Sequence, residues 1–156
     1  NRRLFEDRAL MAFSRQQRQP DQLCALLFLD LDDFKSVNDR YGHKAGDAML
    51  VAVAARAQAA VRQNDTVARW GGDEFIVLLE NISADMLQTI ARRLRSSIQE
   101  PVDYQGIALQ VGVSIGVALY PDAGQDLDQL LHAADHHMYN DKTDRKSASR
   151  PAPLAE

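Results

Sequence analysis

The sequence predicts an α+β fold, in which a central, mostly antiparallel sheet is flanked by helices. Residues 23–29 form an unbroken apolar run of strand length, which is typical of a central strand buried on both faces. Two strand-like segments, 66–68 and 75–79, flank a pair of adjacent glycines and so predict an antiparallel hairpin. Helical segments outnumber the strands, so we expect helices to cover the faces of one sheet.

Length and composition indicate one globular domain. The 156 residues are 46% hydrophobic and 26% charged, with a net charge of −4, which does not indicate binding to a nucleic-acid polymer or a membrane surface. No apolar run approaches the ~20 residues of a membrane span, and no signal peptide is present. The single cysteine, Cys24, lies in the apolar run, which predicts a buried thiol and a cytoplasmic location. Because the chain begins at Asn1 without a methionine, we interpret it as a domain of a longer protein. Another part of that protein could attach it to a membrane.

The first elements lead to an acidic cluster. Apolar spacing predicts a helix over residues 2–18, and the strand over 23–29 follows it. Asp30-Leu31-Asp32-Asp33 comes next, so we expect carboxylates where a buried strand meets a loop. A short helix over 34–41 and a longer one over 45–62 are then expected, separated by Gly42.

The hairpin carries a second acidic cluster. Gly71 and Gly72 are expected at its tip, where they allow a tight turn, and Asp73 and Glu74 follow directly. Since side chains alternate along a strand, we expect these two carboxylates to point to opposite faces, so that only one shares a site with a carboxylate elsewhere. A solvated acidic hairpin is the alternative interpretation.

The second half continues with helices around a long strand. Ser83 is expected to cap a helix that extends to Ile98. Residues 107–119 alternate apolar and small or polar side chains, which predicts one long strand. Its glycines, Gly112 and Gly116, indicate that another element approaches one face closely.

A last helix is predicted over residues 126–141, and residues 147–156, with two prolines, are interpreted as a linker or tail. The expected domain therefore comprises residues 1–146.

The two acidic clusters suggest a metal site. If the first strand pairs beside the hairpin, Asp30 and Asp73 converge, and oxygen-only ligands of this kind suit Mg²⁺ together with substrate phosphates. Lys35 and Lys142 could supply the cations that a phosphate-bearing substrate needs. Taken singly, each lysine is more commonly a solvated surface residue.

The motifs as a set resemble the GGDEF family of diguanylate cyclases, over about residues 1–146. Each motif occurs in the family's order and spacing, which makes a chance match an unattractive explanation. The matching segments are Asn1-Arg2-Arg3-Leu4-Phe5, Asp30-Leu31-Asp32-Asp33-Phe34-Lys35, Asn38-Asp39, Gly42-His43, Gly46-Asp47, Arg69-Trp70-Gly71-Gly72-Asp73-Glu74-Phe75, Val113-Ser114-Ile115-Gly116 and Ala134-Asp135 with Met138-Tyr139 and Lys142.

The resemblance implies a palm-like fold similar to nucleotide cyclases, and the conversion of two GTP molecules into cyclic di-GMP with release of two pyrophosphates. It implies a metal site formed by the carboxylates of Asp30 and Asp73 and the carbonyl of Leu31, with Glu74 beside them on a second ion. The expected ion is Mg²⁺, with Mn²⁺ as the alternative. Asp73 and Glu74 are the implied catalytic residues, and Asp73 would help to deprotonate the attacking 3′-hydroxyl.

The resemblance also implies substrate-binding residues. Asn38 and Asp47 match the family's guanine-binding positions, and guanine offers two donors to a carboxylate where adenine lacks the N1 donor. An acid in the first turn of a helix, interacting with the helix dipole, is the alternative for Asp47. The remaining implied contacts to the nucleotide come from Phe34, Lys35, Gly71, Gly72, Lys142 and Lys146.

A separate inhibitory product site is implied by Arg62 and Asp65, which form an Arg-x-x-Asp motif five residues before the glycine pair. The planar guanidinium group suits guanine edges and phosphates. Arg93, or its neighbour Arg92, would add to the site. A surface ion pair is the alternative, since the motif alone is weak.

One departure from the family leaves a second function open. Arg145 and Lys146 stand where the family usually has glycine and arginine, which puts contacts to the terminal phosphates in doubt. We therefore carry two hypotheses: an active, product-inhibited cyclase working as a transient homodimer, and a catalytically silent GTP- or cyclic di-GMP-binding module of a larger signalling protein. A different nucleotide cyclase is disfavoured by Asn38 and Asp47.

Overall fold

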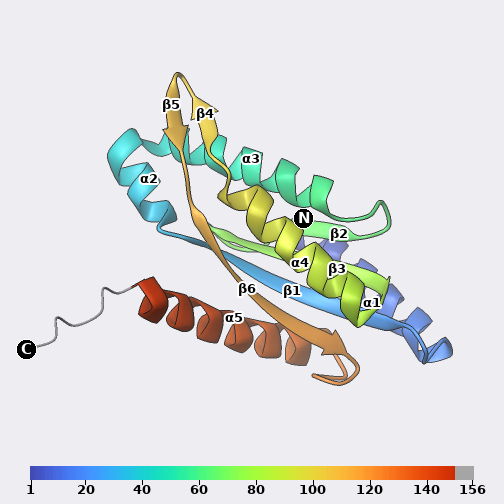
Figure 1. The fold of residues 1–156 in the computed structure, drawn as a ribbon. Coiled ribbons are helices and arrows are strands. Elements are labelled where there is room, and N and C mark those ends of the chain that lie inside the picture. The colour runs from blue at the N-terminus through green and yellow to red at the C-terminus, as the bar shows by residue number, and fades with distance from the viewer. Residues whose placement is uncertain (150–156) are drawn as a thin grey trace, which may run out of the picture.

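The fold is built on a four-stranded antiparallel sheet. The computed structural model describes the backbone of residues 1–149 and the side chains of residues 1–145. The strands of the sheet lie in the order β2-β3-β1-β6, and each neighbouring pair is antiparallel (Figure 1). Their bounds are Leu23–Asp32 for β1, Thr66–Arg69 for β2, Glu74–Ile82 for β3 and Gly112–Tyr120 for β6. The predicted α+β class with an antiparallel sheet is confirmed.

Five helices within residues 1–149 cover the two faces of the sheet (Figure 1). One face packs against α3 and α4, with α2 at one end, and the opposite face packs against α1 and α5, so the sheet separates two hydrophobic clusters. The helix bounds are Arg2–Arg18 for α1, Phe34–Tyr41 for α2, His43–Ala60 for α3, Ala84–Gln99 for α4 and Leu127–Ser149 for α5.

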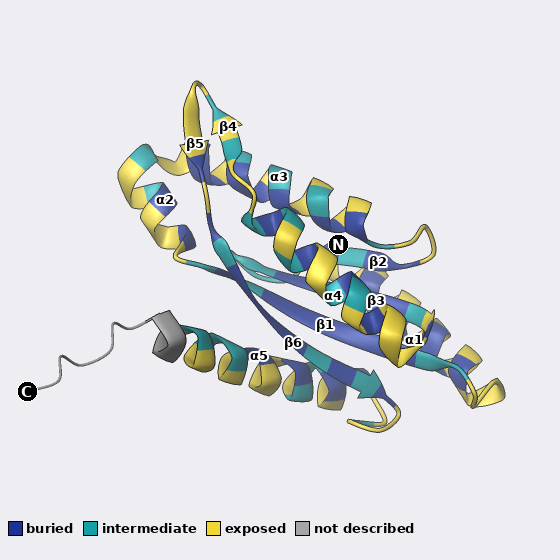
Figure 2. Cartoon of the chain, viewed as in Figure 1, coloured by how far each residue is buried: buried dark blue, intermediate teal, exposed yellow. Residues whose placement is uncertain are grey.

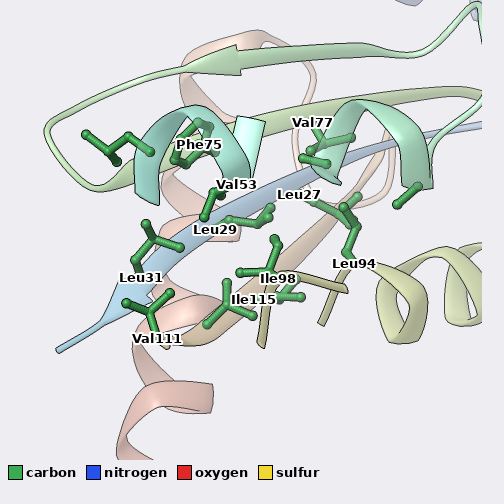
Figure 3. Close-up of a cluster of buried hydrophobic side chains, with 14 of the residues drawn as sticks. Leu27, Leu29, Leu31, Val53, Phe75, Val77, Leu94, Ile98, Val111 and Ile115 are labelled. Atoms are coloured by element: carbon green, nitrogen blue, oxygen red, sulfur yellow. The ribbon is translucent and has the colours of Figure 1, made fainter. Parts of the chain in front are cut away.

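The central strand β1 contributes to both clusters. Leu27, Leu29 and Leu31 belong to the cluster under α3 and α4, which Figure 3 shows, whereas Leu26 and Phe28 belong to the cluster under α1 and α5. Both sets are buried, and the middle of the sheet is buried almost throughout (Figure 2). This two-sided burial explains why the sequence of β1 shows no polar alternation.

Two predicted local features are confirmed. The Ser83 side chain accepts a hydrogen bond from the Met86 N–H at 3.1 Å and so caps α4. A Cβ atom at Gly116 would lie 1.9 Å from the carbonyl oxygen of Ala134. Helix α5 therefore packs directly on β6, as the glycines of that strand predicted.

The prediction of one long strand over residues 107–119 was wrong. The chain forms two strands there, β5 (Ile107–Leu109) and β6, and β5 pairs with β4 (Val102–Tyr104) in a separate two-stranded sheet. Alternation continues through the break because Val111 is buried between the two strands. Side-chain alternation reports which face is covered and does not identify the backbone partner.

Two elements are longer than the sequence predicted. Strand β1 extends to Asp32, because β6 pairs with it as far as Gly112, so Asp30 and Asp32 lie within the strand and not in a loop. Helix α5 continues to Ser149 and includes residues 147–149, which were assigned to the tail. The remainder of the predicted tail, residues 150–156, lies outside the described residues.

The outer edge of β6 is covered by side chains. The backbone N–H of Ile115 donates to Asp141 at 3.0 Å, and that of Val117 donates to Nδ1 of His137 at 2.8 Å. On the same edge the Val113 carbonyl accepts from Arg95 of α4 at 2.9 Å. Backbone groups of an edge strand thus find partners without a further strand.

None of the helices within residues 1–149 is both long enough and apolar enough to cross a membrane.

Candidate active site at the acidic end of the sheet

Three carboxylates gather at one end of the sheet. Asp30 on β1 lies directly opposite Glu74 on β3 in the strand register, so the two side chains share a face. Asp73 precedes β3, and its carbonyl accepts the backbone N–H of Leu31 at 3.0 Å. The expectation that Asp73 and Glu74 point to opposite faces rested on strand alternation, which does not apply to Asp73 because this residue lies in the turn before β3. Which of the two shares a site with Asp30 stays a prediction.

Burial and repulsion from neighbouring carboxylates raise the pKa values of Asp30 and Glu74. Burial is the largest cause of the raised pKa of Asp30, and the charges of Asp73 and Asp32 raise it further, while Lys142 opposes them. The pKa of Glu74 is also raised, first by burial and then by Asp30 and Asp73. The acidic end is therefore an environment in which added positive charge is stabilising.

Helix α5 supplies such charge. The Nζ atom of Lys142 lies 3.2 Å from Oδ2 of Asp30 and 4.0 Å from Oδ1 of Asp32. Burial alone lowers the pKa of Lys142, but the neighbouring carboxylates, Asp30 first among them, raise it overall. Arg145, one turn further along, has its guanidinium 3.7 Å from Oδ2 of Asp32 and also donates to the Val113 carbonyl.

The donor set suits a hard divalent cation. Oδ1 of Asp30 is buried and lacks a hydrogen-bond partner among the described residues, and the surrounding ligand atoms are carboxylate and carbonyl oxygens of the kind that Mg²⁺ prefers. Within residues 1–145, no three acidic, histidine or cysteine side chains are already gathered as a metal cluster. A bound ion would therefore have to draw these carboxylates closer together.

A pocket of about 300 Å³ adjoins the acidic end. Asn38, Asp47, Gly72 and Asp73 all line it, so the two positions expected to bind guanine open onto the same space as the acidic turn. Phe34 also contributes to the wall. Three further residues, His43, Leu50 and Arg69, also line the pocket. His43 and Arg69 belong to the segments that match the family, but none of the three was expected at the site.

Gly46 determines where Asn38 lies. A Cβ atom at residue 46 would lie 1.8 Å from Oδ1 of Asn38, so only glycine leaves space for that amide beside α3. Gly71 has a corresponding role, since a Cβ atom there would lie 2.6 Å from Oε2 of Glu74. Gly71 thus accommodates Glu74 and does not line the pocket, in contrast to Gly72.

Two other expected substrate contacts lie outside this pocket. Lys35 is exposed on α2, and Lys142 lies at the carboxylates of the acidic end. The backbone of Lys146 belongs to α5, but its side chain lies outside the described residues.

Arg69 is a site residue that sequence reasoning missed. Its guanidinium group donates to the Gly71 carbonyl at 3.0 Å and to the Gly72 carbonyl at 2.9 Å. These two hydrogen bonds stabilise the backbone of both glycines in the turn. The backbone of the turn is closed by the N–H of Trp70, which donates to the Glu74 carbonyl at 2.8 Å. A basic residue just before a double glycine is the signal that could have indicated this role.

The Arg62–Asp65 motif is partly buried and firmly held. Asp65, whose side chain is 1% exposed, pairs with the Arg62 guanidinium at 3.1 Å and accepts the backbone N–H groups of Arg62 and Glu80. The guanidinium group also donates to the carbonyls of Glu80 and Asn81. Arg62 lines a hollow of about 1000 Å³ between α1 and the sheet. Arg93 of α4 donates to the carbonyl of Ala60, which lies two residues before Arg62 in the chain, at 3.4 Å.

Comparison with known proteins identifies the family. The family model described as "Diguanylate cyclase, GGDEF domain" matches residues 1–148. The chain is 44% identical over 142 residues to MucR of Pseudomonas aeruginosa, named a bifunctional diguanylate cyclase/cyclic di-GMP phosphodiesterase, and 42% identical over 157 residues to the diguanylate cyclase TpbB of the same species. These matches cover 91% and 99% of the chain, but only 21% of MucR and 36% of TpbB.

Solved structures agree with this assignment. The crystal structure of the TpbB GGDEF domain superposes with a TM-score of 0.88 at 40% identity, covering 92% of this chain and 90% of that one. The GGDEF domain of DgcB from Caulobacter crescentus, solved in complex with cyclic di-GMP, gives a TM-score of 0.81 at 25% identity and covers 92% of this chain and 85% of that one. From its sequence motifs, its antiparallel sheet and these matches, the chain belongs to the GGDEF family of diguanylate cyclase domains.

Proposed function

We propose that this domain is an active diguanylate cyclase that condenses two GTP molecules into cyclic di-GMP. The observation that carries the proposal is the position of Asp73, which borders both the acidic end of the sheet and the pocket formed by Asn38 and Asp47. A nucleotide whose guanine contacts Asn38 and Asp47 would direct its phosphates toward that carboxylate.

In each transfer, the 3′-oxygen of one GTP forms a bond to the α-phosphorus of the other. The bond between that phosphorus and the oxygen that bridges the α- and β-phosphates breaks. Pyrophosphate leaves, and the Asp73 carboxylate takes the proton of the attacking hydroxyl. Two such transfers give cyclic di-GMP and two pyrophosphates. Asp30, the Leu31 carbonyl, Asp73 and Glu74 would hold Mg²⁺, or Mn²⁺ in its place, which supplies neutralisation of the triphosphate charge.

Cations and backbone groups of the chain would complete the triphosphate site. Lys142 is already at the acidic end, beside Asp30, and would exchange this carboxylate for a phosphate oxygen when GTP binds. We propose the same phosphate-binding role for Lys35 and Lys146. We also propose that Phe34 and Gly72 contact the nucleotide from the pocket wall, and that Gly71 contributes by leaving space for the Glu74 side chain.

We also propose that cyclic di-GMP inhibits the enzyme at Arg62, Asp65 and Arg93. Support comes from the DgcB domain, whose structure contains cyclic di-GMP, and from the partly exposed guanidinium group of Arg62. A surface ion pair does not account for Asp65, because that side chain is buried. The enzyme would act in the cytoplasm as a transient homodimer, as one part of a longer signalling protein, and its catalytic domain would comprise residues 1–146.

A catalytically silent binding module is the second candidate. Arg145, which stands at a family glycine position, pairs with Asp32 two residues from Asp30, and this favours a site whose carboxylates are already neutralised. Incubation of the protein with GTP and Mg²⁺, followed by chromatography for cyclic di-GMP and pyrophosphate, distinguishes the two functions. Both products are expected, and their loss with EDTA is the control. Binding of GTP or cyclic di-GMP without product formation would support the module, and absence of binding of either nucleotide would contradict both proposals.

A further inference from the structure

Trp70, the first residue of the acidic turn, is held from two sides by the first turn of α1. The Arg2 guanidinium lies over the indole ring, with its carbon 3.9 Å from the ring centroid. Phe5 meets the same indole in an edge-to-face arrangement, with centroids 5.9 Å apart and an interplanar angle of 66°. One helical turn therefore contacts the indole ring through two side chains.

That helical turn is itself well anchored. The Asn1 side chain accepts the backbone N–H groups of Arg3 and Leu4 at 2.9 and 3.4 Å, which caps the helix. Phe5 is 1% exposed and belongs to the hydrophobic cluster under α1 and α5. Arg2 therefore extends toward Trp70 from a fixed base, although Arg2, like Arg3 and Leu4, is itself solvent-exposed.

The contact reaches the carboxylates through the backbone. The N–H groups of Trp70 and Gly71 both donate to the Glu74 carbonyl, at 2.8 and 3.3 Å. Glu74 in turn lies opposite Asp30, and the Asp73 carbonyl accepts the Leu31 N–H. Displacement of the indole would thus move the turn that carries Asp73 and Glu74 relative to β1.

We propose that Arg2 is a positioning residue for the acidic site: by holding the Trp70 ring, it fixes the turn from Trp70 to Glu74 and so the spacing between its carboxylates and Asp30. Its effect on turnover depends on the proposed cyclase function, whereas its effect on the turn and on cation binding does not. Arg3 is a matched control, because it carries the same charge in the same turn and has no contact with Trp70 among the described interactions.

The test compares Arg2→Met, Arg2→Lys and Arg3→Met with the parent protein. Trp70 is the only tryptophan, so near-ultraviolet circular dichroism and acrylamide quenching of fluorescence report its environment without metal or nucleotide. Binding of Mn²⁺ alone is followed by electron paramagnetic resonance. We expect Arg2→Met to increase quenching and to weaken Mn²⁺ binding roughly two- to fivefold, the range of an exposed cation–π contact. Arg2→Lys should restore most of both signals, and Arg3→Met should change neither.

The outcomes separate the two proposals. Unchanged Trp70 signals and Mn²⁺ affinity in Arg2→Met, in a protein with parent-like far-ultraviolet circular dichroism, would overturn the positioning role. Equal losses in Arg2→Met and Arg3→Met would also overturn it, because they would indicate a general charge effect. If the parent forms no cyclic di-GMP but the Arg2 effects appear as expected, the positioning role stands and the cyclase proposal fails.

Discussion

The Nζ atom of Lys142 lies 3.2 Å from Oδ2 of Asp30, although the two residues are 112 positions apart in the chain. The ion pair joins the last helix to the central strand at the acidic end of the sheet. It also leaves the second oxygen of Asp30 buried and unpartnered among the described residues. Stability should therefore respond to pH and to divalent cations at this site.

The first prediction concerns that response. The folded-state pKa values of Asp30 and Glu74 are raised, so the folded state binds these protons more tightly than the unfolded state. At a pH below their unfolded-state pKa values, about 4, these two acids contribute their full stabilisation. This contribution is lost as the pH rises through their raised folded-state pKa values. We expect Mg²⁺ to raise Tm more at pH 7 than at pH 5, measured by calorimetry, and Asp30→Asn to reduce this difference. An equal Mg²⁺ effect at both pH values would contradict the prediction.

The second prediction concerns catalysis. Asp73→Asn should leave the fold intact, because the Asp73 group that bonds to Leu31 is a backbone carbonyl. Turnover should fall by roughly 10²–10⁴-fold, the usual contribution of a general base, since an amide neither accepts the proton nor ligates the metal as an anion. Steady-state assays with GTP check the rate, and circular dichroism checks the fold. Parent-like turnover in the folded variant would sink the assignment.

The third prediction concerns base choice. GTP should bind better than ATP, and Asp47→Ala should narrow the difference by about 1.5–3 kcal/mol, or roughly 10- to 150-fold in affinity. Gly46→Ala should have a similar effect without touching a guanine contact directly, because the added methyl displaces the Asn38 amide. Titration calorimetry with both nucleotides measures the difference in binding free energy between GTP and ATP. Equal affinities of the parent protein for GTP and ATP would rule the assignment out.

The fourth prediction concerns feedback. Cyclic di-GMP should inhibit noncompetitively, and Arg62→Ala should relieve inhibition while initial activity is preserved, because Arg62 does not line the nucleotide pocket. Asp65 would keep two backbone donors, the N–H groups of residues 62 and 80, so the fold should survive. Inhibition curves and direct binding measurements on the variant provide the check. Unaltered product affinity in Arg62→Ala would show that the site lies elsewhere.

The fifth prediction concerns assembly. The described residues provide one pocket with Asn38 and Asp47 and one acidic end, whereas the proposed reaction needs two GTP molecules that attack each other. Two copies must therefore meet face to face, and activity per mole should rise with protein concentration as the dimer forms. Assays across a hundredfold dilution, with light scattering in parallel, test this. Constant specific activity from a protein that stays monomeric would refute it.

Local patterns in the sequence predicted most of the fold. The strand at 23–29 and the helix that ends near Ile98 were predictable because buried positions carry apolar residues, and these positions recur with the period of the element. The break between β5 and β6 left no such trace, because Val111 remains buried where the backbone changes partner. The extension of β1 to Asp32 was also missed, since pairing with Gly112 is a property of two distant segments.

The site was predictable to the extent that motifs carry it. Adjacent acids and glycines indicated Asp30 and Asp73 as candidates, but Lys142 could not be assigned a carboxylate without the packing of α5 on the sheet. The contact of Arg2 with Trp70 depends on how α1 crosses β2, and no spacing rule in the sequence relates the two residues. Long-range contacts of this kind are properties of the tertiary arrangement and have no local signature.

The covered edge of β6 has a consequence for the behaviour of the protein in concentrated solution. An edge strand with free N–H and carbonyl groups is a template for β-pairing between molecules, which leads to aggregation. Here Asp141 and His137 occupy the N–H groups of Ile115 and Val117 from the side of α5, and the opposite edge strand, β2, has only 4 residues. At high concentration, copies of the domain are therefore disfavoured from associating edge to edge through their sheets. Reversible association through other surfaces is not affected.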